Sequence, residues 1–281
     1  EVAVGVKEMR SKHGVQPGLA VVLVGNNPAS AVYVRNKEKS ALEVGIYGES
    51  FRLPEDVSER KVTDLVHRLN NDGRYHGILV QLPLPPHISE NRVIEAINPL
   101  KDVDGLHPYN MGLLVEGRPL FVPATPAGIQ QMLIRAGYDP DGKHVVVCGR
   151  SNIVGKPVSN LLMQRLVGSN ATVTVCHSRT SDISNITRQA DILIVAIGKP
   201  LFVTAEMVKE KTVVIDVGIN RLEDPQKRRG YRLVGDVDYD SVHVKVEAIT
   251  PVPGGVGPVT IAMLLQNTLK AARISVHPDI R

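Results

Sequence analysis

Short apolar runs alternate with amphipathic segments along most of the chain. In the first half, residues 18–25 and 77–82 are apolar almost throughout, which is typical of buried parallel strands. Residues 29–44 and 57–70 are predicted helices, and Ser89 suits the N-cap of a shorter helix that ends near residue 97. We therefore expect strands and helices to alternate in this half.

The alternation is clearer in the second half of the chain. The predicted strands are residues 144–149, 171–176, 191–198 and 212–218, and the predicted helices are residues 156–166 and 259–272. Such alternation predicts a parallel sheet that is covered by helices on both faces. The fold class is therefore α/β.

A Gly- and Pro-rich stretch, residues 99–126, separates the two halves and shows little periodicity. Loops of this length in compact domains are usually functional. Thr125 and Pro126 then begin a predicted helix that ends near residue 136. A length of 281 residues is enough for two ordinary domains.

Composition and charge exclude several classes of protein. The net charge of +4 suits an acidic small ligand and is too weak to indicate nucleic acid. Cys148 and Cys176 each end an apolar run without metal-ligand spacing, so we expect reduced, buried thiols in a cytoplasmic protein without a metal site. No apolar run approaches membrane-spanning length, and we expect no membrane association. The sequence begins at Glu1 and not at Met, so a preceding segment stays possible.

The turn after the first strand of the second half is a candidate dinucleotide site. It reads Gly149-Arg-Ser-Asn-Ile-Val-Gly155 and leads from a strand into a helix, where a Rossmann fold binds the pyrophosphate on helix N-terminal amides. The spacing differs from Gly-x-Gly-x-x-Gly, and a plain strand–helix turn is the alternative. The candidate cofactor-binding residues here are Gly149, Arg150, Ser151, Val154 and Gly155.

The end of the next strand indicates which cofactor is used. An NAD enzyme usually has Asp or Glu at this place, whereas this chain has Cys176-His-Ser-Arg-Thr180. Ser178, Arg179 and Arg150 suit the 2′-phosphate of NADP, although Arg179 could instead be an ordinary surface charge. Gly198 and Gly218 end the later strands and would let a flat nicotinamide approach the backbone, with Ile219 packed against its ring.

Four polar side chains of the first half are candidates for the substrate site. Tyr33 and Lys37 are four residues apart on a predicted helix and so share a face. Gln81 ends a buried strand, and Asp104 precedes Gly105. Each also has an ordinary explanation: a surface lysine beside an aromatic ring, a hydrogen-bonded core amide and a turn-initiating aspartate.

Six motifs together resemble the bifunctional methylenetetrahydrofolate dehydrogenase–cyclohydrolase family. The nucleotide turn at 149–155 is one, and the other five are Tyr33-Val-Arg-Asn-Lys37, Val80-Gln-Leu-Pro-Leu-Pro85, Lys101-Asp-Val-Asp-Gly105, Asp216-Val-Gly-Ile-Asn220 and Thr250-Pro-Val-Pro-Gly-Gly-Val-Gly-Pro258. They follow the order of the family and span nearly the whole chain.

The resemblance implies a role for each candidate. Tyr33 would stack on the aminobenzoate ring, Lys37 would be the catalytic lysine tuned by Gln81, and Asp104 would hold the pterin amino edge, whereas Asp102 would be structural. The loop that lines the folate would contribute Pro251, Val252, Gly254 and Gly255. The implied substrates are tetrahydrofolate derivatives, and the implied assembly is a homodimer formed through the nucleotide domain.

The implied architecture has two α/β domains with a cleft between them. Residues 1–124 would form the folate-binding catalytic domain and residues 125–249 a Rossmann-like NADP-binding domain with a parallel sheet. The closing helix, about 258–273, would pack back on the first domain. One shared cleft would serve both reactions.

The implied reactions are oxidation of 5,10-methylenetetrahydrofolate to the methenyl form and hydrolysis of that product to 10-formyltetrahydrofolate. Removing the hydride leaves a cation stabilised by two nitrogens, so this step needs alignment and no His or Tyr base. The hydrolysis needs proton transfer, which Lys37 could provide if its pKa is lowered. A dehydrogenase without hydrolase activity and an NADP-binding regulatory module are the alternatives, and the set Tyr33, Lys37, Gln81 and Asp104 argues against both.

Overall fold

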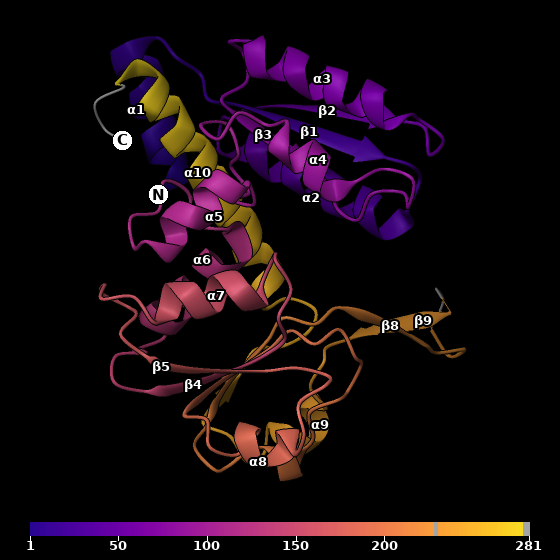
Figure 1. The fold of residues 1–281 in the computed structure, drawn as a ribbon, viewed down its shortest axis with the longest axis vertical. Coiled ribbons are helices and arrows are strands. Elements are labelled where there is room, and N and C mark those ends of the chain that lie inside the picture. Colours follow the sequence, from indigo (N-terminus) through magenta and orange to yellow (C-terminus); the bar gives the residue numbers. More distant parts are fainter. Residues whose placement is uncertain (228–229, 278–281) are drawn as a thin grey trace. The chain divides into compact units, whose positions relative to one another are not determined.

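The computed structural model describes residues 1–227 and 230–277. The chain forms two compact units (Figure 1). Unit 1 is Glu1–Ala124 with Ile261–Arg281, and unit 2 is Thr125–Thr260. Unit 2 thus extends past the predicted limit at residue 249.

Unit 1 is built on a parallel sheet in which the described strands have the order β2-β1-β3. The strands are β1 (Gly18–Val24), β2 (Tyr47–Leu53) and β3 (Gly77–Val80). The helices are α1 (Val2–His13), α2 (Pro28–Glu43), α3 (Glu59–Asn71), α4 (Glu90–Glu95) and α5 (Pro108–Val115), together with most of α10 (Val256–Val276). Ser89 caps α4 as predicted, because its hydroxyl accepts the Arg92 N–H.

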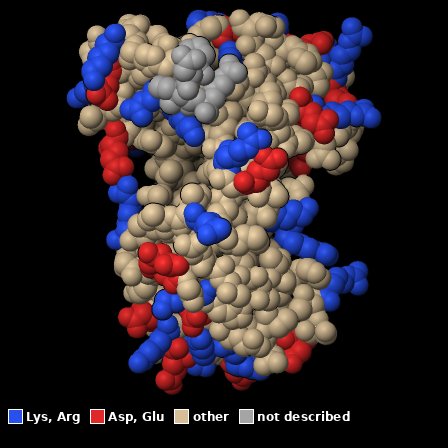
Figure 2. Space-filling model, turned by 60° about the vertical axis from the view of Figure 1, so that its left-hand side comes forward, with Lys and Arg blue, Asp and Glu red and all other residues tan. Residues whose placement is uncertain are grey.

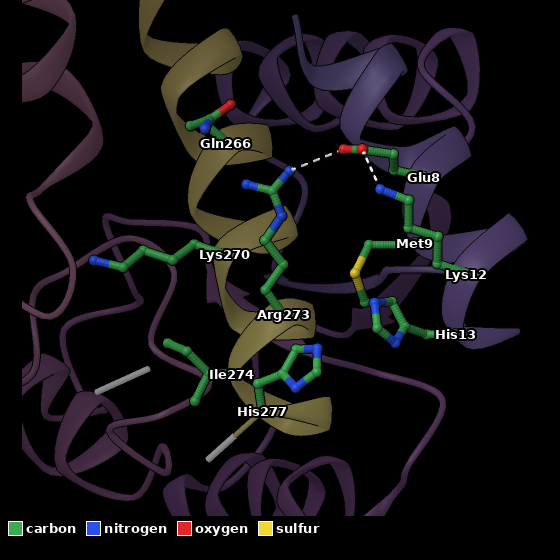
Figure 3. A pocket seen from close by; sticks show the side chains of 9 residues that line it. All are labelled: Glu8, Met9, Lys12, His13, Gln266, Lys270, Arg273, Ile274 and His277. Atoms are coloured by element: carbon green, nitrogen blue, oxygen red, sulfur yellow. Dashed lines mark hydrogen bonds and ion pairs between the residues drawn. The ribbon is translucent and has the colours of Figure 1, made fainter. Parts of the chain in front are cut away.

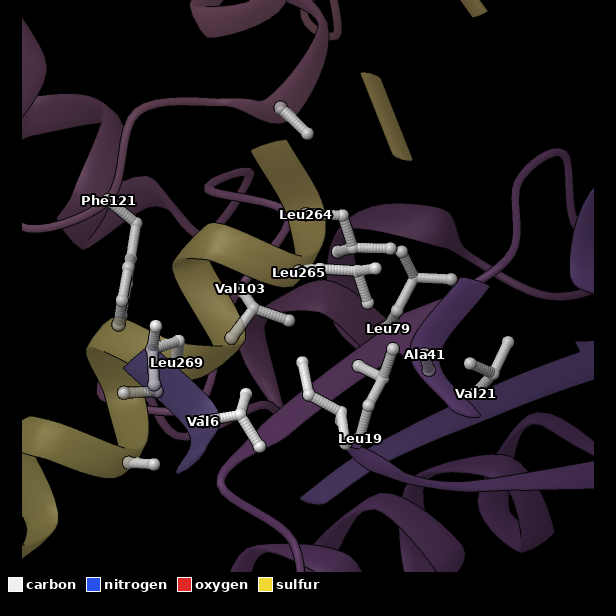
Figure 4. Close-up of a cluster of buried hydrophobic side chains, with 14 of the residues drawn as sticks. Val6, Leu19, Val21, Ala41, Leu79, Val103, Phe121, Leu264, Leu265 and Leu269 are labelled. Carbon is white, nitrogen blue, oxygen red and sulfur yellow. The ribbon is translucent and has the colours of Figure 1, made fainter. Parts of the chain in front are cut away.

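Alternating side chains of β1 give unit 1 two apolar layers. Leu19 and Val21 pack with residues of α1, α2 and α10, including Leu265 (Figure 4). Ala20 and Val22 face the opposite layer, to which α3 contributes most. Because successive residues of a strand point to opposite faces, a strand that is apolar throughout can fill both layers.

Three elements of unit 1 differ from the expectation. The strand β2 and the helix α1 carry several polar residues and were not predicted. β2 lies at the edge of the sheet, where each of its residues stays partly or fully exposed. The stretch 99–126 was expected to be largely irregular, but it contains α5. Pro108 begins that helix, and the His107 ring nitrogen Nδ1 accepts the Tyr109 N–H at 3.0 Å.

Unit 2 has a parallel sheet whose described strands have the order β10-β7-β6-β4-β5. These strands are β4 (His144–Cys148), β5 (Thr172–Cys176), β6 (Ile192–Val195), β7 (Val213–Asp216) and β10 (Ala248–Ile249). The helices are α6 (Ala124–Arg135), α7 (Gly155–Leu162), α8 (Ile183–Thr187), the 3-10 turn η1 (Ala205–Met207) and α9 (Tyr239–Val242). An antiparallel pair, β8 (Asn220–Glu223) and β9 (Tyr231–Val234), was not predicted.

Both faces of this second sheet are covered. Val145 and Val147 of β4 pack with α6 and α7, and Val146 faces the layer that contains α9 and the η1 turn. The α7 helix ends at Leu162, four residues earlier than predicted, and α10 begins at Val256, three residues earlier. Helix ends are the least certain part of a prediction from periodicity.

Acidic and basic side chains are interspersed over the face of the molecule that Figure 2 shows. This distribution agrees with the scattered basic residues of the sequence and shows no continuous basic band on that face. In the described part of the chain, no helix is long and apolar enough to cross a membrane.

Candidate active site

A lysine and a glutamine meet in unit 1. Tyr33 and Lys37 lie one turn apart on α2, and Gln81 follows β3. The Gln81 N–H donates to the carbonyl of Val22 at 2.9 Å, which extends the β1–β3 pairing by one residue. Lys37 Nζ donates to Gln81 Oε1 at 2.9 Å, and Gln81 Nε2 donates to the carbonyl of Leu82 at 2.8 Å. Because both ends of the amide are paired, its oxygen is fixed toward the lysine.

Burial shifts the pKa values of the ionisable side chains around Lys37. Lys37 is half-buried, and loss of solvation lowers its pKa, while the nearby charge of Asp104 opposes the shift. Burial raises the pKa of Asp104. The positive charge of Lys37 opposes this rise, and the negative charge of Asp102 adds to it. Burial also raises the pKa of Tyr33. Deprotonation of Lys37 to the neutral amine therefore costs less free energy than deprotonation of an exposed lysine.

The loop that carries Asp104 is held by Asp102, which is buried. The Asp102 carboxylate accepts the N–H of His107 at 2.8 Å, the N–H of Leu106 at 3.3 Å and the Nδ2 of Asn110 at 2.8 Å. These bonds close the turn between the Asp104 segment and α5. These bonds are those of a residue that holds the loop, and the structural role that the resemblance implies for Asp102 stays a prediction.

Two further features hold this loop, and one of them, Asn267, was not predicted from the sequence. Asn267 of α10 donates from Nδ2 to the carbonyls of Val103 and Val122, both at 2.9 Å. Gly105 has φ of +73°, and a Cβ there would lie 2.8 Å from Pro123 N. The glycine was visible in the Lys101–Gly105 motif, but no sequence signal distinguishes Asn267 from an ordinary polar residue of an amphipathic helix.

The nucleotide turn of unit 2 is formed by close backbone packing. Gly149 has φ of +140°, and a Cβ there would lie 2.1 Å from the carbonyl oxygen of Ala196. A Cβ at Gly155 would lie 2.3 Å from the Gly149 carbonyl oxygen. Ser151 Oγ accepts the N–H of Val154 at 3.1 Å, which orders the start of α7. Both predicted glycines are therefore required by the shape of the turn.

The predicted phosphate-binding side chains lie on two adjacent loops. Cys148 and Cys176 are partners in the β4–β5 register, so the loops that follow them leave neighbouring strand ends. Arg150 on the first loop and Ser178 and Arg179 on the second are all exposed. Exposed guanidinium and hydroxyl groups can reach an anionic ligand there.

The ends of β6 and β7 carry the predicted nicotinamide positions. Gly198 has φ of +72° and no atom near its missing Cβ, so its surface is open. Gly218 is buried and Ile219 is 44% exposed. Val195 and Asp216 are register partners, which places these two strand ends side by side.

The predicted folate loop also lies in unit 2, directly after β10. Gly254 has φ of +107°, and the Gly255 N–H donates to the carbonyl of Pro251 at 3.0 Å. Pro251 and Gly254 are exposed and Val252 is half-buried. The loop thus presents backbone at the surface, as suits close approach of a ligand.

A cavity in unit 1 is separate from these residues. It lies between α1 and α10, with Lys12 and His13 on α1, Lys270 and Arg273 on α10, and His277 directly after α10 (Figure 3). None of the predicted site residues lines it. Among the described residues, no group of three or more His, Cys, Asp or Glu side chains is arranged to hold a metal ion.

Family models match both units. Residues 1–104 match the catalytic domain of the tetrahydrofolate dehydrogenase/cyclohydrolase family, and residues 123–276 match its NAD(P)-binding domain. The chain belongs to this family. Its recognition from six motifs is thereby confirmed, as are the α/β fold with a Rossmann-like domain and the assignment as a dehydrogenase and cyclohydrolase enzyme.

Individual relatives agree with the family models. The chain is 59% identical to the bifunctional protein FolD of Salinibacter ruber over 92% of this chain and 86% of that protein. The crystal structure of the Campylobacter jejuni FolD enzyme is 46% identical and has a TM-score of 0.90, covering 98% of this chain and 94% of that one. The Trypanosoma brucei enzyme, solved with NADP and an inhibitor, is 43% identical with a TM-score of 0.93 and covers 98% and 93% of the two chains.

Proposed function

We propose that this enzyme oxidises 5,10-methylenetetrahydrofolate with NADP and hydrolyses the resulting 5,10-methenyl compound to 10-formyltetrahydrofolate. The observation that carries the proposal is the hydrogen bond from Lys37 to Gln81 beside Asp104, on a chain of this family. A chain with only the dehydrogenase step has no need of a lysine whose pKa is lowered in this way.

For the oxidation, the task of the protein is binding and alignment. Bound NADP supplies the hydride acceptor. We assign Tyr33 to stacking on the aminobenzoate ring and Asp104 to the pterin amino edge, and we assign further substrate contacts to Pro251, Val252, Gly254 and Gly255. Because the carbon that loses the hydride is flanked by two nitrogens, no side chain has to remove a proton in this step.

For the hydrolysis, we assign proton transfer to Lys37. Water adds to the methenyl carbon and the five-membered ring opens, which requires a proton to leave the water and one to reach a ring nitrogen. Because burial lowers the pKa of Lys37, its neutral amine forms more readily than that of an exposed lysine and can take the first proton, and the resulting ammonium can then deliver one. Gln81 Oε1 directs Nζ by accepting its hydrogen bond.

For the cofactor, we propose a preference for NADP over NAD. The turn fits a dinucleotide, because Gly149 and Gly155 let the backbone pass tightly from β4 to the N-terminus of α7, with Arg150 exposed beside them. Arg150, Ser178 and Arg179 are assigned to the 2′-phosphate, and no acidic residue stands at the end of β5. The related Trypanosoma brucei enzyme was crystallised with NADP.

For the assembly, we propose a homodimer that forms through β5. This strand is the edge of the unit 2 sheet, and Val175 on it is 44% exposed. Met163, Leu166 and Val167, which follow α7, are exposed as well. An unprotected edge strand beside exposed apolar side chains is a favourable place for a second copy to pair. We also propose a reducing, cytoplasmic location, in which the free thiols of Cys148 and Cys176 persist.

An absorbance assay tests the proposal. Methylenetetrahydrofolate is supplied with NADP or with NAD, NADPH or NADH formation is followed, and methenyl product is measured after acid quenching. We expect faster turnover with NADP and little methenyl accumulation. Stoichiometric methenyl accumulation would remove the cyclohydrolase assignment of Lys37, and absence of turnover with either cofactor would contradict the proposed function as a whole.

A further inference from the structure

Two buried aspartates lie at the edge of unit 2 where the nicotinamide positions are. Asp216 is the last residue of β7 and is 3% exposed, and Asp236 follows β9 and is fully buried. Neither residue was predicted as part of the site. Among the ion pairs between described residues, none involves either carboxylate.

Asp236 fixes the backbone after β6. Its Oδ2 accepts the N–H of Ile197 at 2.8 Å and the N–H of Gly198 at 2.7 Å. Its Oδ1 accepts the Nδ2 of Asn220 at 2.8 Å. One carboxylate therefore links the turn at Gly198 to the first residue of β8, which directly follows Ile219.

Asp216 in turn fixes Asp236. Oδ1 of Asp216 accepts the N–H of Asp236 at 2.9 Å and the N–H of Gly218 at 3.0 Å, and its Oδ2 accepts the N–H of Val237 at 3.0 Å. The Asp216 N–H donates to Thr250 Oγ1 at 2.9 Å. The two side chains thus form a continuous set of bonds across the ends of β6, β7 and β9.

The local glycines allow this arrangement. A Cβ at Gly218 would lie 2.3 Å from Asp236 Oδ1, and a Cβ at Gly235 would lie 1.7 Å from Asp216 Oδ2. Gly198 is different, because its missing Cβ faces open space. The carboxylates therefore hold the backbone at Gly198 and Gly218 from the protein interior, while the missing Cβ of Gly198 leaves open space for a ligand.

The energetic cost of this arrangement indicates a functional role. Two neighbouring buried carboxylates repel each other, and burial raises the pKa of Asp216 to about 6. A fold that only had to close these turns could use neutral side chains without this cost. Energetically costly arrangements of this kind are concentrated where a protein needs a fixed geometry for binding or reaction.

We infer that Asp236, held in place by Asp216, is a positioning residue for the nicotinamide end of the cofactor. It sets the peptides of Ile197 and Gly198 and, through Asn220, the segment that carries Ile219, so that the nicotinamide ring is aligned for hydride transfer. The inference rests on the proposed function. It assigns Asp236 no part in the hydrolysis at Lys37.

Asp236→Ala is the main test. The variant leaves three donors without their acceptor, and we expect kcat/KM for NADP-dependent oxidation to fall at least tenfold. Hydrolysis of supplied methenyltetrahydrofolate should stay within about twofold. Binding of 2′,5′-ADP, which has the 2′-phosphate but no nicotinamide, should be unchanged while NADP binding weakens. Asp191→Ala is the matched control, because Asp191 accepts the His144 N–H at 2.9 Å at the opposite end of the strands.

Two milder variants separate positioning from general support. Asp236→Asn keeps an oxygen for Ile197 and Gly198 if Asn220 turns its amide, so it should recover most of the oxidation rate. Asn220→Ala keeps Asp236 and removes one link, so it should give a smaller loss confined to oxidation, and it serves if Asp236→Ala does not fold. Equal losses of both activities, loss of 2′,5′-ADP binding, or no effect on oxidation would overturn the inference. If the wild-type enzyme itself does not turn over NADP, the proposed function fails and not this inference alone.

Discussion

The two units present their candidate groups in different ways. In unit 1 the groups are side chains, half-buried and close enough to shift one another's pKa values, as with Lys37 and Asp104. In unit 2 the cofactor positions are backbone turns shaped by Gly149 and Gly155, together with exposed polar side chains. The first arrangement suits the movement of a proton, and the second suits the recognition of a large anionic ligand.

This difference indicates how substitutions should act. Removing a tuned side chain deletes one chemical step and leaves the fold, whereas adding a single methyl group to a tight backbone turn disturbs binding and stability together. The two proposed activities should therefore be separable by substitutions in the two units. The predictions below test that separation.

The largest effect is expected for Lys37→Ala. Loss of the proton-transferring group should lower the cyclohydrolase rate by about 10²- to 10⁴-fold, the usual range for such a group, while NADP-dependent oxidation stays measurable. Hydrolysis of methenyltetrahydrofolate and NADPH formation are measured separately on the same preparation. Lys39→Ala, which alters an exposed lysine of the same helix, is the control. Full cyclohydrolase activity in Lys37→Ala would contradict the assignment.

The next effect is expected for Gly149→Ala in the nucleotide turn. A Cβ 2.1 Å from the Ala196 carbonyl must displace backbone, which costs about 3 kcal/mol or roughly a hundredfold in kcat/KM for NADP. Both Tm and NADP kinetics are measured. Gly142→Ala separates the two causes, because Gly142 also has positive φ, +68°, but open space around it. Equal effects of the two substitutions would show that steric fit at Gly149 is not decisive.

The contrast between the units also explains what the sequence could predict. The strands β1, β4 and β6 are apolar and buried, and glycine and turn signals flank them, so periodicity located them. The edge strand β2 contains Gly48, Glu49 and Ser50, and its strand conformation depends on pairing with β1. Local pattern carries no information about such a partner.

The site residues divide in the same way. The nucleotide turn was visible because its function follows from the local order of strand, turn and helix. The pairing of Lys37 with Gln81 was expected from family resemblance, since spacing alone left each residue with an ordinary explanation. Asp236 could not be found from spacing, because its partners Ile197 and Gly198 are far away in the sequence and only the folded sheet brings them together. The catalytic and binding roles of all these residues stay predictions.

A smaller effect is expected for Arg150→Ala combined with Ser178→Ala. Loss of these two solvent-exposed contacts to the 2′-phosphate should raise the KM for NADP roughly tenfold and leave the KM for NAD nearly unchanged. Steady-state kinetics with both cofactors measure the ratio. Arg165→Ala, at an exposed arginine of the same unit, should not change it. Equal effects on NADP and NAD would remove the 2′-phosphate role and leave Arg150 as a general surface charge.

The smallest effect is a shift in the pH dependence of hydrolysis. The rate should rise as Lys37 loses its proton, and this limb should lie below the pH range of an ordinary lysine because burial lowers the Lys37 pKa. The Asp104 charge opposes that shift by favouring the ammonium form. Asp104→Asn should therefore lower the Lys37 pKa further and move the limb of kcat, measured at saturating methenyltetrahydrofolate, to lower pH.

Gln81→Glu provides the opposite change. A negative charge at the atom that accepts the Lys37 hydrogen bond should favour the ammonium and move the same limb to higher pH. Arg150→Ala in unit 2 should leave it in place. Shifts of the same sign in Asp104→Asn and Gln81→Glu would exclude Lys37 as the titrating group. Opposite shifts would assign the limb to this lysine and confine the tuning of proton transfer to unit 1.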